Sequence, residues 1–431
     1  MKIFYSIKYR LLGIFQKPFL RNTLWMLLAQ VLGLAMQAAY FLIIARTLGT
    51  QQYGVFVGVT ALASIVFPFA SLGSGDILIK KVSINRAFFK EYWGNALLTV
   101  FIFSLILSFL GVIGAQVFFP KIISPLLIFF VLLSDLLCLT IWDLASKAFI
   151  AVHLVKMAAQ LKLLLNLNKL IFAFILVAFF QKPTITLWTI LYFLSTGFTA
   201  LVSYLLAHRM LGSPKLAISR IKPEILQGFY FSVSESAATI NASMDQAMLV
   251  SLSTLKATGI YAAAYRFVDV GIVPLHALLA TSYAKFFQEG ATGISGSLNF
   301  AKRLLPILGT YGVAASTGLF VLAPVLPYVL GNEYAGAVEA LRWLAPIPFI
   351  LALQFLAADT LTGSGFQGVR SGIQITAALL NILLNLWLIP LYSWKGAAWS
   401  TLASDSLKLL SLWAIVVFFY RQQAQNFKEN Q

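Results

Sequence analysis

The chain has 431 residues, of which 60% are hydrophobic and only 10% charged, and its formal net charge is +17. A soluble domain carries about 25% charged residues. This composition and the mean hydropathy of +0.87 therefore indicate an integral membrane protein. The single cysteine excludes an intramolecular disulfide, and three scattered histidines argue against a histidine metal centre. The apolar runs are continuous rather than alternating, which predicts membrane-spanning α-helices.

About twenty apolar residues cross a bilayer as a helix. On that rule the sequence contains twelve spans, at approximately 24–45, 53–75, 94–118, 123–142, 160–180, 185–207, 228–251, 260–284, 304–326, 339–358, 371–389 and 396–420. The expected domains are a cytoplasmic interfacial basic segment (1–22), an N-terminal six-helix bundle (23–207), a basic cytoplasmic linker (208–227), a C-terminal six-helix bundle (228–420) and a cytoplasmic tail (421–431).

The positive charge alternates between successive connections. Of the 31 Lys and Arg residues, 22 lie in the two tails and the even-numbered connections, and only five in the odd-numbered ones. Cytoplasmic segments carry the excess of Lys and Arg, so both termini are expected in the cytoplasm. The charge is spread over short segments as topology requires, which argues against a nucleic-acid partner.

A weak internal repeat appears when the sequence is shifted by 205 residues. Lys17 and Pro18 then align with Lys222 and Pro223, and Gly54 aligns with Gly259. Two halves with the same orientation predict a pseudo-two-fold axis along the membrane normal and a central cavity between two pseudo-symmetric bundles. Such symmetry is typical of transporters. The simplest interpretation of Gly54 itself is close helix packing.

Ionisable side chains inside the spans are the strongest functional signal, because burying a charge in hydrocarbon costs a few kcal/mol or more. Glu235 and Asp245 have no cation at helical spacing in their own span, which favours a role in binding a coupling ion. Arg266 and Asp269 are three residues apart, so they form either an ion pair or part of the site. For Asp405 and Lys408, which are also three residues apart, an internal ion pair is preferred over a role in the site.

The candidate residues fall into three groups. Substrate phosphate would be bound by Arg46, Arg266 and Lys169. Ion coupling would involve Glu235, Asp245 and Asp269. Sugars would be contacted by Gln37, Asn241, Tyr265, Asn381 and Asn385. The alternatives are that the amide side chains hydrogen-bond between helices and that Arg46 is an interfacial anchor.

No catalytic constellation is visible. The chain has no Walker A sequence, no HExxH, no Gly-rich dinucleotide loop and no long extramembrane segment. We therefore expect no catalytic residues, no cofactor and no metal centre, and no nucleotide site on this chain to power transport.

The stretch ARTLGTQQYGVFVGVTALASIVFPFASLGSGD (45–76) resembles the signature of Wzx-type polysaccharide flippases, for O-antigen, capsule or exopolysaccharide. These belong to the multidrug/oligosaccharidyl-lipid/polysaccharide exporter superfamily. MDQAMLVSLSTLKATGIYAAAYRFVD (244–269) resembles the matching signature of the seventh and eighth spans. The later GNEYAGAVEALRWLAPIPFILAL resembles the ninth-to-tenth connection of that family.

The resemblance implies a bacterial inner-membrane protein with two six-helix bundles around a V-shaped cavity. Its expected substrate is an undecaprenyl-pyrophosphate-linked oligosaccharide, flipped to the outer leaflet by alternating access. It also implies coupling to a proton or sodium gradient and contact with polysaccharide polymerase machinery. Arg46 and Arg266 are the cations that the resembling stretches supply. Two alternatives stay open: a multidrug–cation antiporter of the same fold, and a non-transporting scaffold of a polysaccharide assembly complex.

Overall fold

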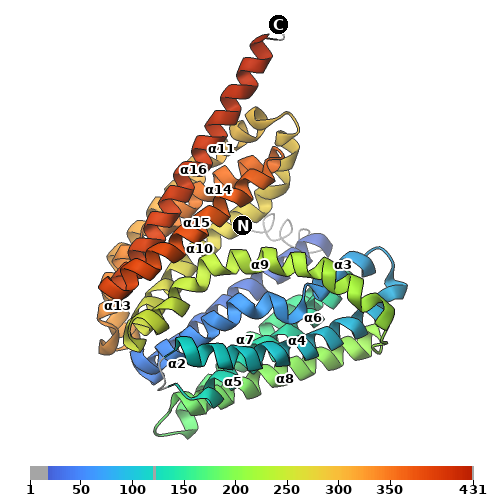
Figure 1. Cartoon of the computed structure of the whole chain (residues 1–431), viewed down its shortest axis with the longest axis vertical. Helices are drawn as coiled ribbons and strands as arrows, with labels where there is room; N and C mark the ends of the chain where they lie inside the picture. Colours follow the sequence, from blue (N-terminus) through green and yellow to red (C-terminus); the bar gives the residue numbers. More distant parts are fainter. Residues whose placement is uncertain (1–17, 120–122, 430–431) are drawn as a thin grey trace, which may run out of the picture. The chain divides into compact units, whose positions relative to one another are not determined.

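A computed structural model of the chain describes residues 18–119 and 123–429 (Figure 1). The described residues form helices joined by short turns, and no strand occurs among them. The main helices are α2 (Pro18–Ser71), α3 (Ser74–Val82), α4 (Phe89–Phe118), α5 (Pro125–Leu133), α6 (Thr140–Ala151), α7 (Val155–Phe179), α8 (Ile185–Leu211), α9 (Ile218–Leu252), α10 (Leu255–Gly290), α11 (Ile294–Leu322), α12 (Leu326–Leu330), α13 (Gly336–Leu344), α14 (Ile347–Gly363), α15 (Gln367–Tyr392) and α16 (Trp394–Glu429). Short helices, η1 (Arg86–Phe88), η2 (Ser134–Leu139), η3 (Ala323–Val325) and η4 (Asn332–Tyr334), connect or interrupt them. Most of the predicted segment 1–22 lies outside the described residues.

Within the part of the chain described, ten helical stretches are long and apolar enough to cross a membrane. The protein is therefore an all-α, multi-pass membrane protein. One of the ten, Val31–Ser71, covers two expected spans, and the helical geometry of α2 is broken inside it at Gly49 (φ 68°, ψ 175°). The 35-residue helix α9 is not among the ten. The expectation of twelve spans thus stays a prediction.

The chain divides into two compact units. Unit 1 consists of Met1–Leu48 and Ala63–Ser236, and unit 2 of Gly49–Leu62 and Ala237–Gln431. The segment after Gly49 thus groups with the second unit, and the first part of α9 groups with the first. Helix α9 also begins inside the expected linker 208–227. The predicted bundle limits at 207 and 228 are not tested by this division.

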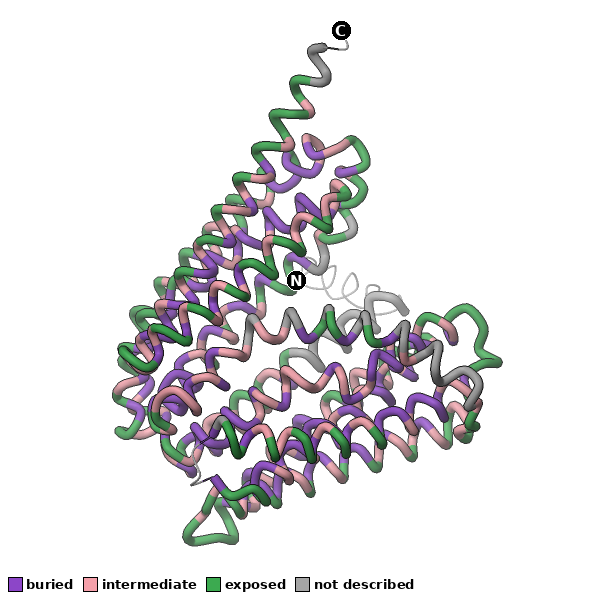
Figure 2. Tube along the Cα trace, in the orientation of Figure 1, coloured by how far each residue is buried: buried purple, intermediate pink, exposed green. Residues whose placement is uncertain are grey.

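Unit 1 is built around large aromatic side chains. Trp93, Phe149 and Trp188 are fully buried among α4, α6 and α8. Between α5 and α6 the chain makes a π-helical turn, Ser134–Leu139, in which each hydrogen bond spans one residue more than in an α-helix. Such turns are frequent at functional sites, and this one contains Asp135. Exposed residues recur along the helices (Figure 2). In unit 1 many of them are large apolar side chains, such as Phe109, Phe174 and Leu201, as expected in lipid.

Unit 2 holds the segment after Gly49 against α9 and α10. A β-carbon built on Gly54 would overlap the carbonyl oxygen of Leu255, and one on Gly259 would overlap that of Thr50. The two glycines aligned by the sequence repeat therefore touch each other's helices. The packing interpretation of Gly54 is confirmed. Elsewhere in the unit, α10, α11 and α14 enclose an apolar core that includes Phe286 and Leu308.

Candidate functional site

Asp245 on α9 lies at the centre of a buried polar network in unit 2. Its side chain is 4% exposed. Tyr261 of α10 donates its hydroxyl hydrogen to Asp245 Oδ2 at 2.9 Å, and Asn385 of α15 donates from Nδ2 to Asp245 Oδ1 at 2.6 Å. Thr401 of α16 also donates to Oδ2. The carboxylate carried by α9 thus accepts hydrogen bonds from three other helices, α10, α15 and α16.

The network continues along α15 and α16. Asn385 Nδ2 also donates to Asn381 Oδ1 at 2.9 Å, and Asn381 Nδ2 donates to Ser404 Oγ at 3.2 Å. Asn385 Oδ1 is buried and has no hydrogen-bond partner among the described residues. Most buried polar atoms are paired, so an orphan acceptor beside a carboxylate suggests a missing donor or cation.

The charge of Asp245 is not balanced by a basic side chain within the described part of the chain. Lys408, on the same helix as Thr401, pairs with Asp405 at 2.9 Å, as predicted. The oxygens around Asp245 are carboxylate, amide and hydroxyl, which suit a proton or a hard cation. Asn381 and Asn385 are both buried in this network. Their surroundings favour ion binding over the predicted sugar contact.

Arg266 and Asp269 form a second charged group on α10. Arg266 Nη1 lies 3.6 Å from Asp269 Oδ2, and both side chains are about half exposed. The ion-pair interpretation is therefore confirmed, although the exposure of Arg266 leaves its guanidinium accessible to an anion. Tyr265, the predicted sugar contact, is half-buried next to this pair, with its ring centroid 5.8 Å from that of Tyr261.

In unit 1, Lys169 belongs to a chain of polar contacts around the π-helical turn. Lys169 Nζ lies 3.4 Å from the Tyr192 hydroxyl and 5.0 Å from the centroid of its ring. The Tyr192 hydroxyl donates to Asp135 Oδ1 at 2.7 Å, and Asp135 is 7% exposed. Lys169 is half-buried, and Asp135 is the carboxylate that Tyr192 links to its ammonium.

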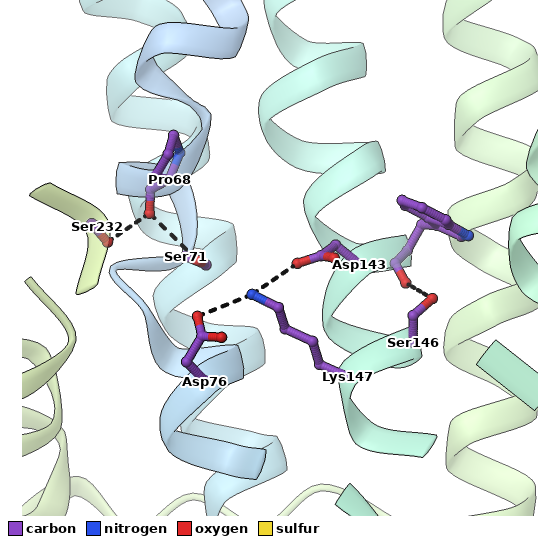
Figure 3. Close-up of polar contacts among 8 residues, drawn as sticks. Pro68, Ser71, Asp76, Asp143, Ser146, Lys147 and Ser232 are labelled. Carbon is purple, nitrogen blue, oxygen red and sulfur yellow. Dashed lines mark hydrogen bonds and ion pairs between the residues drawn. The ribbon is translucent and has the colours of Figure 1, made fainter. Parts of the chain in front are cut away.

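Glu235 lies in unit 1, whereas Asp245, ten residues later on α9, lies in unit 2. Glu235 is exposed and lies within electrostatic range of Lys147. Figure 3 shows that Lys147 of α6 bridges Asp76 of α3, at 3.0 Å, and Asp143, at 3.3 Å. Glu235 thus has a cation nearby on another helix, although its own helix carries none at helical spacing. Asp245 differs from Glu235 because no basic side chain of the described residues pairs with it.

Three further predicted site residues lie outside these polar groups or outside the described side chains. Gln37 on α2 donates from Nε2 to Asn166 Oδ1 of α7 at 3.2 Å, which is the interhelical alternative. Arg46 is exposed near the end of the first part of α2, and no hydrogen bond or ion pair joins it to another described residue. The side chain of Asn241 lies outside the described residues.

Sequence reasoning missed Tyr261, Thr401 and Tyr192. Their partners are 16, 156 and 57 residues away along the chain. A single hydroxyl in an apolar span gives no periodic signal, so these three residues could not be identified from the sequence. Among the described residues, no three His, Cys, Asp or Glu side chains are grouped as metal ligands.

Comparison with known proteins identifies the family. Residues 19–282, well over half of the chain, match the family described as "Polysaccharide biosynthesis protein". A curated relative from Escherichia coli (strain K12), named "Putative O-antigen transporter", is 24% identical over 199 residues. That match spans 46% of this chain and 48% of the relative, so the chain matches about half of the relative's length.

Solved structures share the fold at low sequence identity. An inward-facing multidrug resistance transporter of the MATE family, in the MOP superfamily, has a TM-score of 0.72 and 13% identity, with 90% of this chain and 96% of that chain covered. The lipid II flippase MurJ in an inward closed conformation has a TM-score of 0.70 and 14% identity, with 91% and 87% covered. The resemblance predicted from the sequence is confirmed at the level of the family: the chain belongs to the polysaccharide biosynthesis protein family.

Proposed function

We propose that the protein flips lipid-linked oligosaccharide units across the bacterial inner membrane, from the cytoplasmic to the outer leaflet. The substrate class is a glycan joined through pyrophosphate to a polyprenyl chain. The observation that carries the proposal is the buried Asp245 network, in which hydroxyl and amide groups on three other helices hold the carboxylate of α9. An uncompensated carboxylate within a membrane marks an ion or proton pathway by default.

The cations that would bind the pyrophosphate are Lys169, Arg46 and Arg266. Guanidinium and ammonium groups form strong charge-assisted hydrogen bonds with phosphate oxygens. Lys169 is the best placed of the three in the described contacts, because Tyr192 and Asp135 hold its half-buried ammonium in a polar environment. Gln37, Asn241 and Tyr265 remain candidate sugar contacts.

The transport cycle would be alternating access in a twelve-span chain with both termini in the cytoplasm. Two six-helix bundles would enclose a central cavity for the polar headgroup, while the polyprenyl chain stays in lipid. Protonation or cation binding at Asp245 would change the charge of its network once per cycle and so couple the cycle to an ion gradient. Glu235 and Asp269 are weaker coupling candidates, because Lys147 and Arg266 already act on their charges.

The substrate can be tested in proteoliposomes that contain a polyprenyl-pyrophosphate-linked oligosaccharide. Movement is measured by the loss of access to a membrane-impermeant glycosidase. Wild-type protein should move the glycan lipid across the bilayer, and Lys169→Met should slow this by about tenfold or more, since a hydrogen bond to a charged group contributes about 1.5–3 kcal/mol. Lys169→Arg should retain most of the rate.

Lys162→Met provides the matched control. Lys162 is exposed on the same helix, seven residues earlier, so its loss should change the rate less than about twofold. Glycan movement no faster than in protein-free vesicles would contradict the proposal. Efflux of a cationic dye instead would point to a multidrug antiporter. Binding of a polymerase without movement of either substrate would point to a scaffold.

A further inference from the structure

A cavity of about 710 Å³ lies in unit 2, and none of the residues of the Asp245 network lines it. One wall is a single face of α11, formed by Val313, Ser316, Thr317 and Phe320, which follow one another at helical spacing. Another wall is a single face of α13, formed by Glu339, Arg342 and Trp343. The remaining lining is Ala345, Pro346, Phe349 and Leu402. The cavity is thus an apolar groove between helices with one cation at its edge.

Aromatic side chains mark one end of this groove as a membrane interface. The Trp343 ring, at the groove, packs edge-on against Trp399, with centroids 5.6 Å apart, and Tyr392 lies 5.0 Å from Trp399. Lys395 Nζ lies over the ring of Trp394 at 5.5 Å. Trp and Tyr gather where hydrocarbon meets lipid headgroups. The α11 face lines the groove from this end, and its Val313 and Phe320 side chains are about half exposed.

The charges at that end leave one cation available. Glu339 pairs with Lys395 at 2.8 Å, which balances both of them. Arg342 is exposed, and its guanidinium lies 5.3 Å from the centroid of Phe320. Among the described residues no carboxylate pairs with Arg342. A guanidinium held against an aromatic ring keeps its hydrogen-bond donors free for a phosphate.

We infer that this groove binds an anionic membrane phospholipid. The phosphate lies against Arg342 at the interface, and one acyl chain lies along Val313, Phe320 and Phe349. The anionic charge of the lipid complements Arg342, and the chain covers apolar side chains that the protein leaves open. The site is independent of the proposed transport activity, because none of its residues belongs to the candidate substrate or ion groups.

Native mass spectrometry of the purified full-length protein tests this inference. Phosphatidylglycerol and phosphatidylethanolamine are added in turn to delipidated protein. The wild-type protein should retain one phosphatidylglycerol molecule in preference to phosphatidylethanolamine. Arg342→Gln should weaken phosphatidylglycerol binding by about tenfold and abolish the preference, since it removes charge-assisted hydrogen bonds to the phosphate. Val313→Trp, which fills the groove and leaves Arg342 in place, should weaken the binding of both lipids.

Arg303→Gln is the matched control, because Arg303 is exposed on α11 outside the groove. It should bind phosphatidylglycerol as the wild type does. Equal binding of the two lipids by wild-type protein, or an unchanged preference in Arg342→Gln, would overturn the inference. Displacement of phosphatidylglycerol by undecaprenyl phosphate at equal concentration would assign the groove to the polyprenyl carrier and would also overturn it. Thermal unfolding of each variant verifies that it is folded.

Discussion

Three carboxylates on the membrane helices of unit 2 differ in how their charge is balanced. Asp405 has Lys408 at 2.9 Å, and Asp269 has Arg266 at 3.6 Å. Among the residues that the structure describes, Asp245 has only hydroxyl and amide donors. Both ion pairs join residues three apart on one helix, so the sequence was sufficient to predict them. The donors to Asp245 come from three other helices and were invisible to that reasoning.

The buried pair should be structural. The side chains of Lys408 and Asp405 are 8% and 12% exposed, so removing the ammonium leaves a buried carboxylate without a partner. Lys408→Met should lower the free energy of unfolding by about 3 kcal/mol. The double variant Lys408→Met/Asp405→Asn should recover most of that loss. Unfolding in detergent, followed by a fluorescent thiol or dye assay, measures both, and equal losses in the two variants would refute the structural role.

At the scale of the element, α2 shows that one continuous helical stretch can contribute to two compact units. The break at Gly49 lies between two expected spans, yet the residues after it group with unit 2 because Gly54 and Gly259 allow the backbones to touch. The sequence repeat aligned these glycines, but it carried no information that they would meet. Packing of this kind depends on backbone geometry far apart in the chain.

Close packing makes Gly54 sensitive to the smallest substitution. A β-carbon there would overlap the Leu255 carbonyl oxygen, so Gly54→Ala should lower the free energy of unfolding by about 1–3 kcal/mol. Gly114 on α4 has open space around the same position, so Gly114→Ala should be neutral or slightly stabilising. Thermal unfolding of the two variants side by side provides the comparison. Equal stability would mean that the segment after Gly49 is not tightly packed.

At the scale of the whole molecule, composition was enough to predict an all-α membrane protein, and short motifs were enough to predict its family. The division into units was not predictable in detail, because helices α2 and α9 each contribute to both. The candidate site was predictable only in part. Asp245 and Lys169 stood out as charges in apolar spans, whereas Tyr192 and Thr401 became visible only through their contacts.

The orientation of the chain follows from charge and can be measured directly. In a Cys138→Ala background, Lys182→Cys should react with a membrane-impermeant maleimide applied to the outer side of spheroplasts. Lys215→Cys should react only after permeabilisation. Both side chains are exposed, so a lack of reaction would reflect the membrane rather than burial. The reverse pattern would contradict the predicted topology.

The central claim is that Asp245 couples an ion gradient to glycan flipping. The most direct test measures flipping in proteoliposomes with and without an imposed proton or sodium gradient, for wild type, Asp245→Asn and the control Glu289→Gln. A coupling free energy of about 1–3 kcal/mol corresponds to about 5–150-fold. We predict that at least one gradient accelerates wild type and Glu289→Gln by about fivefold or more, and that neither accelerates Asp245→Asn. Full acceleration in Asp245→Asn at equal protein content would contradict the account.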